Sequence, residues 1–227
     1  MIDIHTHLLP CVDDGSQSFE KSFEMVKQLV NQGVKQLILT PHYRFNFKMS
    51  PEVLKTEFED FKAKIQAELP IELYLGQEVY IEDDIKQLYQ SGEILSMNGS
   101  KYLLCEFSYT HSCDISETVY ELSCMGVIPI IAHVERYAYL TIEDVYEIKN
   151  EGGLIQINAE ALFSKNKKER KLIKKLFAEN LVDFVASDIH EDREVYLEQA
   201  YALVKKKFGE GVAKKVFIEN AEKIIEG

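Results

Sequence analysis

The chain of 227 residues lacks several features that would place it in familiar classes of protein. It has no tryptophan and only four cysteines, none of them in a C-x-x-C pair, so neither a zinc knuckle nor a dithiol redox site is indicated. No arginine stands six residues after any cysteine, which excludes phosphatase chemistry that uses a cysteine thiolate. The sequence also has no P-loop and no glycine-rich dinucleotide loop.

Charge and hydropathy narrow the choice of partners. The 38 acidic residues outnumber the 26 basic ones, and the formal charge of -12 argues against nucleic acid as the main partner, because phosphate backbones need a basic surface. No apolar stretch approaches the roughly 20 residues of a membrane helix, so we expect no membrane insertion. A strand begins at the N-terminus, which leaves no room for a signal peptide. Because unpatterned cysteines also suit a reducing compartment, we expect a cytoplasmic protein. The length fits one domain over residues 1–227, and the oligomeric state stays open.

Short apolar runs alternate with amphipathic segments along the whole chain. The runs predict buried strands at Met1–Ile4, Val34–Thr40, Ile71–Val79, Tyr102–Phe107, Val127–His133, Leu154–Asn158 and Val182–Ser187. The segments between them predict helices at Phe19–Gln32, Pro51–Glu68, Asp83–Gln90, Ile115–Met125, Thr141–Asn150, Lys165–Asn180, Glu191–Phe208 and Gly211–Ile225. Strict alternation indicates an α/β fold with a parallel sheet. Seven strands fit a closed or nearly closed TIM-like (β/α)7 barrel, and the alternative is an open doubly wound sheet.

Side chains that can bind metals gather where these strands end. The candidates are five histidines and four carboxylates: His5, His7, Asp14, His42, Glu78, Glu106, His133, Asp188 and His190. An α/β barrel builds its active site at the carboxyl ends of its strands. Ligands at nearly every strand end therefore favour the barrel over the open sheet, whose ligands would gather at one switch point. This set predicts a hydrolase with two or three divalent metal ions.

The His5-Thr6-His7 motif is the sharpest local signal. Residues i and i+2 of a strand point the same way, so both imidazoles can reach one ion. Asp14 can join them, whereas Asp13 and Gly15 are typical of a turn. The Asp188-Ile189-His190 segment repeats the arrangement at the last strand.

Other candidates have plain structural alternatives. Glu106 has apolar neighbours, and because an unpaired buried carboxylate is costly, we interpret it as a bridge between two ions, with a buried salt bridge as the alternative. A surface position is the alternative for Glu78, and a hydrogen-bonded core histidine is the alternative for His133. His42 is the least secure histidine ligand. His111 is more typical of an exposed or substrate-facing loop.

Arginines follow several of these ligands. Three divalent ions would bring about +6 against about -4 from the carboxylates, which attracts a phosphate dianion. Because arginine binds phosphate in a bidentate way, we expect Arg136 to contact phosphate and to act in catalysis together with Glu106 and Asp14. Arg193 is a further catalytic candidate. For Arg193 and Arg44, phosphate contact and a surface salt bridge are about equally favoured.

Two further patterns have two readings each. Tyr43, Phe45 and Phe47 either form the wall of an aromatic substrate site or pack their own loop. The basic run 165–171 is interpreted as a solvated helix face, with a docking site as the alternative.

With these residues in place, the chain resembles the polymerase-and-histidinol-phosphatase (PHP) superfamily. Within it, the chain resembles most the bacterial protein-tyrosine phosphatases of capsule and exopolysaccharide biosynthesis. The resemblance spans the whole chain and rests on residues 1–7 and 12–15, Thr40-Pro41-His42, Gly76-Gln77-Glu78-Val79-Tyr80, Glu106-Phe107, His133-Val134-Glu135-Arg136-Tyr137 and Ser187-Asp188-Ile189-His190.

The resemblance implies a distorted PHP-type barrel and a metal cluster that favours manganese, with iron, zinc or magnesium as alternatives. It implies that all nine candidates are ligands, that Arg136 contacts phosphate, and that the substrate is the tyrosine-rich phosphorylated tail of a partner tyrosine kinase regulating polysaccharide export. The chain departs from the usual family residues at Val134, Glu191, Val195 and Ala221. None of these is a ligand, so the departures bear on Arg193 and on substrate preference.

Three other functions stay open. A PHP phosphatase for a small metabolite such as histidinol phosphate is the nearest alternative. A PHP nuclease or polymerase-editing domain is disfavoured by the acidic charge. A metal-stabilised binding module without turnover is the alternative outside enzymes.

Overall fold

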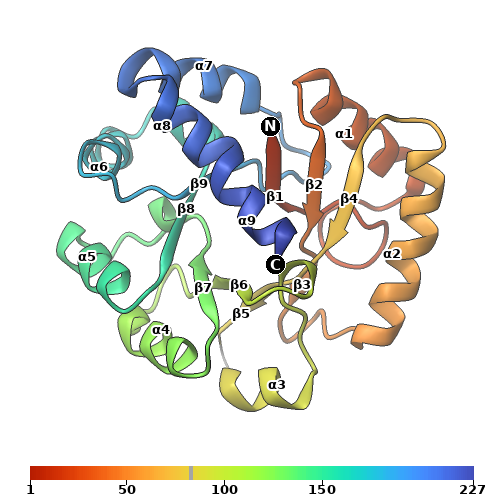
Figure 1. The fold of residues 1–227 in the computed structure, drawn as a ribbon, viewed down its shortest axis with the longest axis horizontal. Helices are drawn as coiled ribbons and strands as arrows, with labels where there is room; N and C mark the ends of the chain where they lie inside the picture. The colour runs from red at the N-terminus through yellow and green to blue at the C-terminus, as the bar shows by residue number, and fades with distance from the viewer. Residues whose placement is uncertain (82–83) are drawn as a thin grey trace.

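The computed structural model describes residues 1–81 and 84–227, in which strands and helices alternate (Figure 1). The strands are β1 (Ile2–Thr6), β2 (Gln36–Leu39), β3 (His42–Tyr43), β4 (Glu72–Leu75), β5 (Glu78–Tyr80), β6 (Tyr102–Glu106), β7 (Ile128–Ile131), β8 (Leu154–Asn158) and β9 (Phe184–Ala186). The α-helices are α1 (Phe19–Asn31), α2 (Pro51–Gln66), α3 (Ile85–Ser91), α4 (Ile115–Cys124), α5 (Ile142–Asn150), α6 (Lys167–Ala178), α7 (Leu197–Phe208), α8 (Glu210–Lys214) and α9 (Asn220–Glu226). Short helical turns are η1 (Met97–Gly99), η2 (Val134–Arg136), η3 (Glu160–Phe163) and η4 (Lys215–Glu219), the last a π-helical turn.

All strand pairs are parallel and form two neighbouring sheets. The first has the order β1-β2-β4 and the second β3-β5-β6-β7-β8-β9. The predicted run 34–40 becomes β2, and β3 is a short strand beyond its predicted end, whereas the predicted run 71–79 is divided into β4 and β5. The short β3 and β5 therefore carry the chain from one sheet into the other.

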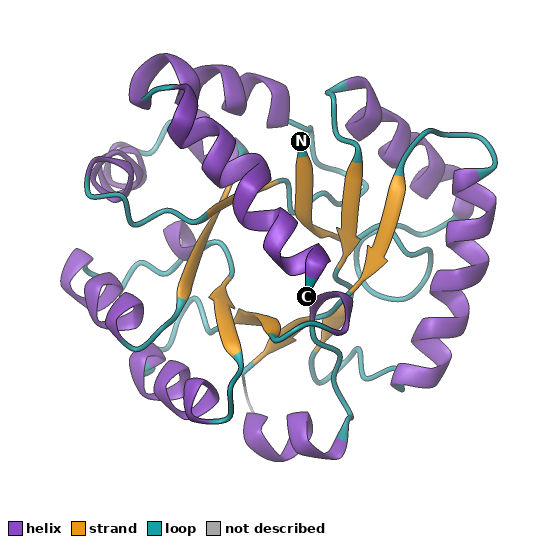
Figure 2. Cartoon of the chain, viewed as in Figure 1, coloured by secondary structure: helices purple, strands orange, loops and turns teal. Residues whose placement is uncertain are grey.

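The sheet curls until its first and last strands meet. Thr6 forms a parallel bridge with Ile189, and the Asp188 N–H donates a 2.9 Å hydrogen bond to the His5 carbonyl oxygen. Helices surround the strands on the outside (Figure 2). The predicted TIM-like α/β barrel is confirmed, and the open doubly wound sheet is wrong because its first and last strands would not pair.

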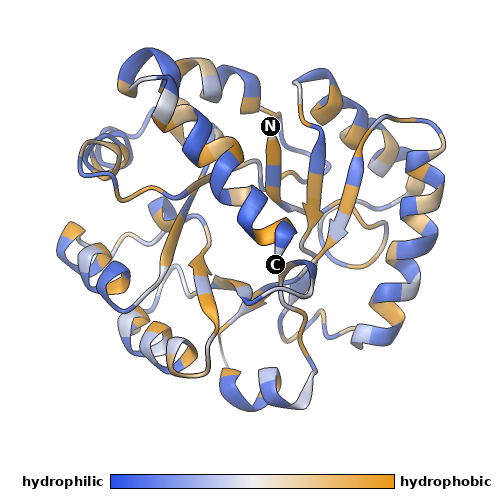
Figure 3. Cartoon of the chain, viewed as in Figure 1, coloured by the Kyte–Doolittle hydropathy of each residue, from blue (hydrophilic) through white to orange (hydrophobic). Residues whose placement is uncertain are grey.

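Hydrophobic residues fill two regions on either side of the sheet. The inner cluster contains Ile4, Leu104 and Phe184 from the strands together with Ala221 and Ile224 from α9, so the C-terminal helix closes one end of the barrel. Figure 1 shows α9 crossing in front of the strands. The outer cluster packs the helices onto the sheet, and the strands are largely hydrophobic while the helices are mixed (Figure 3).

Most helix starts follow the capping residues in the sequence. The side chains of Ser18 and Ser50 accept hydrogen bonds at the starts of α1 and α2, and Thr141 and Asp144 form a capping box at α5. One boundary was wrong: α7 begins at Leu197, not at residue 191, because Arg193 turns back to bond Asp188. The prediction for Asp83 lies outside the described residues.

None of the helices in the described part of the chain has both the length and the hydrophobicity needed to cross a bilayer.

Candidate metal centre

The inward positions of the barrel strands end in charged side chains at the carboxyl edge. On β6, Leu104 lies in the inner cluster and Glu106 follows it at i+2; on β9, Ala186 precedes Asp188 in the same way. Because alternate strand residues share a face, the apolar interior continues directly into a polar centre. The structure brings all nine candidate residues together there. All are buried except Asp14, whose side chain is 45% exposed.

His5 and His7 each present one ring nitrogen to a common point. Their Nε2 atoms lie 3.1 Å apart. His5 Nδ1 lies 3.1 Å from Gln156 Oε1, and His7 Nδ1 lies 2.7 Å from Asp13 Oδ2. These partners accept the Nδ1–H of each ring and leave Nε2 to a metal, as outer partners of metal-binding histidines do. Asp13 therefore does more than shape a turn.

Glu78 occupies the middle of the centre. Its Oε2 lies 3.2 Å from Nε2 of His5, 3.2 Å from Nε2 of His7 and 2.9 Å from Nδ1 of His42. Its Oε1 lies 2.8 Å from His133 Nε2. Burial alone would raise the pKa of Glu78, but the surrounding histidines outweigh burial and hold the pKa well below its usual value. The surface alternative for Glu78 is wrong, since its side chain is fully buried.

Glu106 lies beside this central position. Its carboxylate oxygens are 3.7 Å from His42 Nδ1 and 3.8 Å from His133 Nε2, and Oε1 accepts a hydrogen bond from the Tyr109 hydroxyl. Burial, and then the charge of Glu78, raises the pKa of Glu106 to about 7. The interpretation of Glu106 as the bridging carboxylate stays a prediction, and the geometry adds Glu78 as a second candidate, because Glu78 belongs to two groups of donors and Glu106 to one.

Asp14, His42 and His190 form the outer, solvent-facing part. Asp14 Oδ1 lies 3.3 Å from His42 Nε2 and 3.5 Å from His190 Nε2. Hydrogen bonds from His190 and His42 hold the pKa of Asp14 far below its usual range. The Arg44 guanidinium contacts the other oxygen, Oδ2. His42, the least secure candidate by sequence, therefore connects the two parts of the centre: one ring nitrogen faces Asp14 and the other faces Glu78.

The donor set fits several divalent ions. Four groups offer donor atoms within 4.8 Å of one another: His7, Asp14, His42 and His190; His5, His7 and Asp188; His5, Glu78 and His133; His42, Glu78 and Glu106. His42 Nδ1, Glu78 Oε2 and Glu106 Oε2 are buried without a hydrogen-bond partner in the part of the chain described. Such atoms are costly unless something binds them, and mixed imidazole and carboxylate donors suit manganese, iron or zinc.

Two of the candidate ligands have unusual backbone conformations. His133 has a φ of 33° and Asp188 a φ of 51°, both in the left-handed region. Residues other than glycine rarely adopt it, and such strain persists where the surroundings determine it. At both positions the turn comes directly after a strand and directs the side chain into the centre.

Arg136 and Arg193 converge on Asp188. Arg136 Nη1 lies 2.9 Å and Arg193 Nη1 lies 2.7 Å from the same carboxylate oxygen, Oδ2. The other oxygen, Oδ1, faces Nε2 of His5 at 3.5 Å and Nε2 of His7 at 3.4 Å. One side of Asp188 thus faces the histidines while the other anchors two arginines at the rim.

The neighbouring aromatic residues do not form a single wall. Tyr43 is buried in the outer core, while Phe45 is 79% exposed. The Phe47 ring lies 6.3 Å from the His42 ring, and the Arg44 guanidinium stacks over it at 5.1 Å. Tyr43 therefore packs into the core, while Phe47 contacts His42 and Arg44 at the edge of the centre. The prediction that His111 lies in an exposed loop is confirmed.

Sequence reasoning missed four residues of the centre. Besides Asp13, the β8 amides support it: Gln156 Oε1 accepts from the His133 N–H at 2.8 Å, and Asn158 Nδ2 donates to Asp188 Oδ2 at 2.9 Å. Their signal was the alternation in Leu154-Ile155-Gln156-Ile157-Asn158, which places both amides inward. Tyr109, whose hydroxyl also lies 3.5 Å from His133 Nε2, had no such signal because it belongs to a loop.

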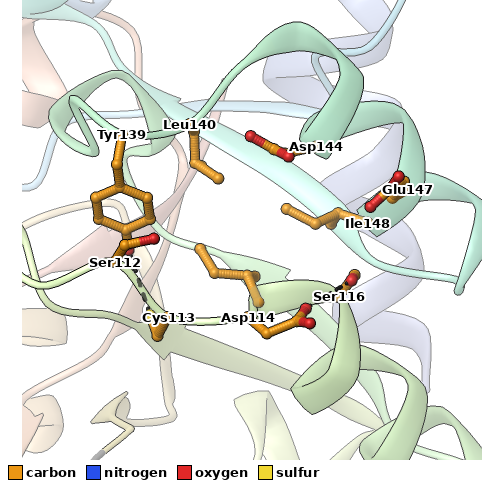
Figure 4. Close-up of a pocket in the computed structure, with 10 residues that line it drawn as sticks. Ser112, Cys113, Asp114, Ser116, Tyr139, Leu140, Asp144, Glu147 and Ile148 are labelled. Atoms are coloured by element: carbon orange, nitrogen blue, oxygen red, sulfur yellow. Dashed lines mark hydrogen bonds between the residues drawn. The ribbon is translucent and has the colours of Figure 1, made fainter.

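A separate cavity of about 310 Å³ lies between the N-terminal ends of α4 and α5 (Figure 4). Asp114, Asp144 and Glu147 line it with their carboxylates. Cys113 Sγ lies 3.3 Å from the Tyr139 hydroxyl at one side, drawn as the dashed line. None of the nine candidate ligands lines this cavity.

Comparisons with known proteins agree with this centre. Residues 1–226 match the model of a family described as capsular polysaccharide synthesis, CpsB/CapC. The chain is 34% identical to tyrosine-protein phosphatase CpsB of Streptococcus agalactiae over 99% of its own length and 98% of the relative's. It is 33% identical to tyrosine-protein phosphatase YwqE of Bacillus subtilis, covering 99% of this chain and 91% of that one.

The fold comparison reaches the same group. A crystal structure from work on YwqE of Bacillus subtilis and CpsB of Streptococcus pneumoniae, described as unique metal-dependent tyrosine phosphatases, superposes with a TM-score of 0.93 at 31% identity. The match covers 100% of this chain and 94% of that one. The chain therefore belongs to the CpsB/CapC family of capsular polysaccharide synthesis.

Proposed function

We propose that this chain is a metal-dependent tyrosine-protein phosphatase of capsular or extracellular polysaccharide synthesis. The similarity to CpsB and YwqE over nearly the whole chain supports this function. The observation that supports it most directly is that overlapping groups of imidazole and carboxylate donors lie next to two arginines. Both arginines bind Asp188 at the rim of these groups. Such a site combines metal binding with recognition of a phosphate dianion.

The nine residues gathered at the strand ends are assigned as ligands of two or three divalent ions: His5, His7, Asp14, His42, Glu78, Glu106, His133, Asp188 and His190. Manganese is the proposed metal, since the donors are imidazoles and carboxylates without thiolates. When bound, such ions lower the pKa of a coordinated water towards about 7 and stabilise charge on phosphate oxygens. Glu78 holds the groups together because it is shared between two of them.

The remaining roles belong to side chains at the rim. Arg136 and Arg193 donate N–H groups to the phosphate oxygens and orient the phosphorus towards the attacking water. Asp14, on the solvent side, and Glu106, beside Tyr109, accept hydrogen bonds from that water and orient it. The water oxygen bonds to phosphorus and the bond from phosphorus to the tyrosine oxygen breaks. One proton of the attacking water ends on the tyrosine oxygen, so tyrosine leaves as the phenol and the other product is inorganic phosphate.

The proposed substrate is a phosphotyrosine-bearing segment of a bacterial tyrosine kinase. The proposed location is the cytoplasm, a reducing compartment that suits the free cysteines Cys11, Cys105, Cys113 and Cys124. Both proposals extend what the relatives' names state.

Phosphate release from a phosphotyrosine peptide tests this function. The protein is stripped of metal, assayed, and assayed again with manganese restored, with histidinol phosphate in parallel. Manganese-dependent release from the peptide at a much higher kcat/KM than from histidinol phosphate is the expected result. A much higher kcat/KM on histidinol phosphate would move the function to a metabolite phosphatase, and no release from either would leave a metal-binding module.

A further inference from the structure

A second cavity opens beside the metal centre and reaches helix α6. It has a volume of about 570 Å³. On one side it is lined by Tyr109 and Arg136, which belong to the rim of the centre, and on the other by Asn166, Lys168 and Leu172 at the start of α6. We refer to it as the α6 groove. When the phosphotyrosine of a peptide lies in the centre, the residues next to it in the peptide extend into this groove.

The α6 side of the groove carries an unusual concentration of positive charge for a chain of net charge -12. Lys168 lines the groove itself. Four more exposed cations lie next to it in the sequence at the start of the helix: Lys165, Lys167, Arg170 and Lys171. Among residues 1–81 and 84–227, none of these cations forms an ion pair. Arg170 Nη1 donates a 2.7 Å hydrogen bond to the Ser164 carbonyl oxygen, which leaves its charge without a carboxylate partner in the part of the chain described.

Two carboxylates, Glu135 and Glu169, also line the groove and offset part of this charge. The five cations at the start of α6 exceed these two carboxylates by three. On the other side of the Tyr137–Leu140 loop, the cavity of Figure 4 presents Asp114, Asp144 and Glu147 instead. The end of α6 that borders the groove is therefore more positive than the Figure 4 cavity, and an anionic chain is favoured at the first over the second.

From this we propose that the α6 groove binds an acidic segment, rich in Asp or Glu, next to the phosphotyrosine of the substrate polypeptide. The proposal rests on the proposed function. Four of the five cations are lysines, and all five are distributed over residues 165–171 rather than directed at one point, so they match a run of carboxylates. A single second phosphate would call for convergent donors, for which arginine is the usual choice.

Matched variants of α6 test the proposal. Lys165→Glu with Lys168→Glu reverses charge at the groove, and Lys174→Glu with Lys175→Glu makes the same change in net charge further along the same helix. At 1.5 Å per residue, the second pair lies roughly 10 Å further from the groove. All four lysines are exposed, and thermal unfolding checks that both variants fold.

The substrates are O-phosphotyrosine, a phosphotyrosine peptide with Asp and Glu on both flanks, the same peptide with Asn and Gln, and a neutral peptide with two phosphotyrosines. We expect the native protein to prefer the acidic peptide over the neutral one, with the preference falling as salt rises. The groove variant should lose about tenfold in kcat/KM on the acidic peptide at low salt, and nothing on O-phosphotyrosine.

Three results would overturn the proposal. These are an equal loss on acidic and neutral peptides, an equal loss in the Lys174→Glu and Lys175→Glu variant, or a preference for the doubly phosphorylated neutral peptide over the acidic one. Failure of the proposed function is a separate result, because the native protein would then show no metal-dependent hydrolysis of O-phosphotyrosine at all.

Discussion

Arg193 donates a 2.7 Å hydrogen bond from Nη1 to Oδ2 of Asp188 and a second, at 2.9 Å, to the Asp188 carbonyl oxygen. This pairing places a guanidinium at the rim of the metal centre. It also explains why the chain from residue 191 to 196 is a loop: the arginine must turn back towards the end of β9.

The first prediction concerns the two arginines at Asp188. Arg136→Lys and Arg193→Lys keep the charge but lose the planar pair of donors that matches a phosphate. We expect each to lower kcat/KM on a phosphotyrosine peptide by about 10- to 100-fold, since charge-assisted hydrogen bonds are worth roughly 1.5–3 kcal/mol. Metal content, measured by mass spectrometry, should stay near the native value. Arg170→Lys, in α6, is the control when assayed on O-phosphotyrosine, which does not reach the α6 groove, and an equal loss there would remove the special role of the rim arginines.

The second prediction separates Glu78 from Glu106. Glu78→Gln should reduce the number of bound metal ions per chain more than Glu106→Gln, because Glu78 belongs to two donor groups and Glu106 to one. Activity should fall by at least about 100-fold in Glu78→Gln, since even outer partners of metal ligands cost about 10- to 100-fold. Equilibrium dialysis with manganese followed by metal analysis measures both variants. If Glu106→Gln loses as many ions as Glu78→Gln, the central position of Glu78 has no consequence for metal binding.

The contrast between these two carboxylates also shows what the sequence can and cannot predict. The alternation of strands and helices predicted the barrel, and side chains at strand ends predicted which residues meet. The roles within the cluster depend on atomic positions that strand periodicity does not determine: β4 stops at Leu75 and the chain resumes as β5 at Glu78, which carries that carboxylate to the middle. The left-handed backbone at His133 and Asp188 likewise has no signal in the residue types.

The third prediction concerns Gly15, in the loop that carries Asp13 and Asp14. A Cβ at this position would lie 2.3 Å from the His7 carbonyl oxygen and 2.4 Å from His7 Cβ, and backbone cannot yield cheaply. Gly15→Ala should therefore displace the loop, break the hydrogen bond between Asp13 and His7, and weaken metal binding by about 10- to 100-fold. Gly211→Ala, which meets no atom within 4 Å, is the matched control and should bind metal normally. Unchanged metal affinity in Gly15→Ala would show that the loop does not position His7.

The fourth prediction concerns the metal-free protein and its pH dependence. Burial lowers the pKa of His42, but the charge of Glu78 and a hydrogen bond to Asp14 outweigh it and raise the pKa to about 9 from 6.5. A group with a raised pKa in the folded state stabilises the fold fully below its unfolded pKa, and loses that contribution as pH rises through its folded pKa. The free energy of unfolding of metal-stripped protein should therefore fall between about pH 6.5 and 9, by an amount of the order of 3 kcal/mol.

Urea unfolding of stripped protein at several pH values measures this fall, and two variants identify its source. His42→Gln should make the fall smaller without abolishing it, because the pKa values of His5 and His7 are also raised. His111→Gln, at an exposed histidine, should leave the profile unchanged. Manganese should flatten the profile, because metal ligands bind as neutral imidazoles and the metal replaces the proton. A flat profile in the stripped native protein would mean that the carboxylates do not hold His42 protonated, and that metal binding releases no proton from it near pH 8.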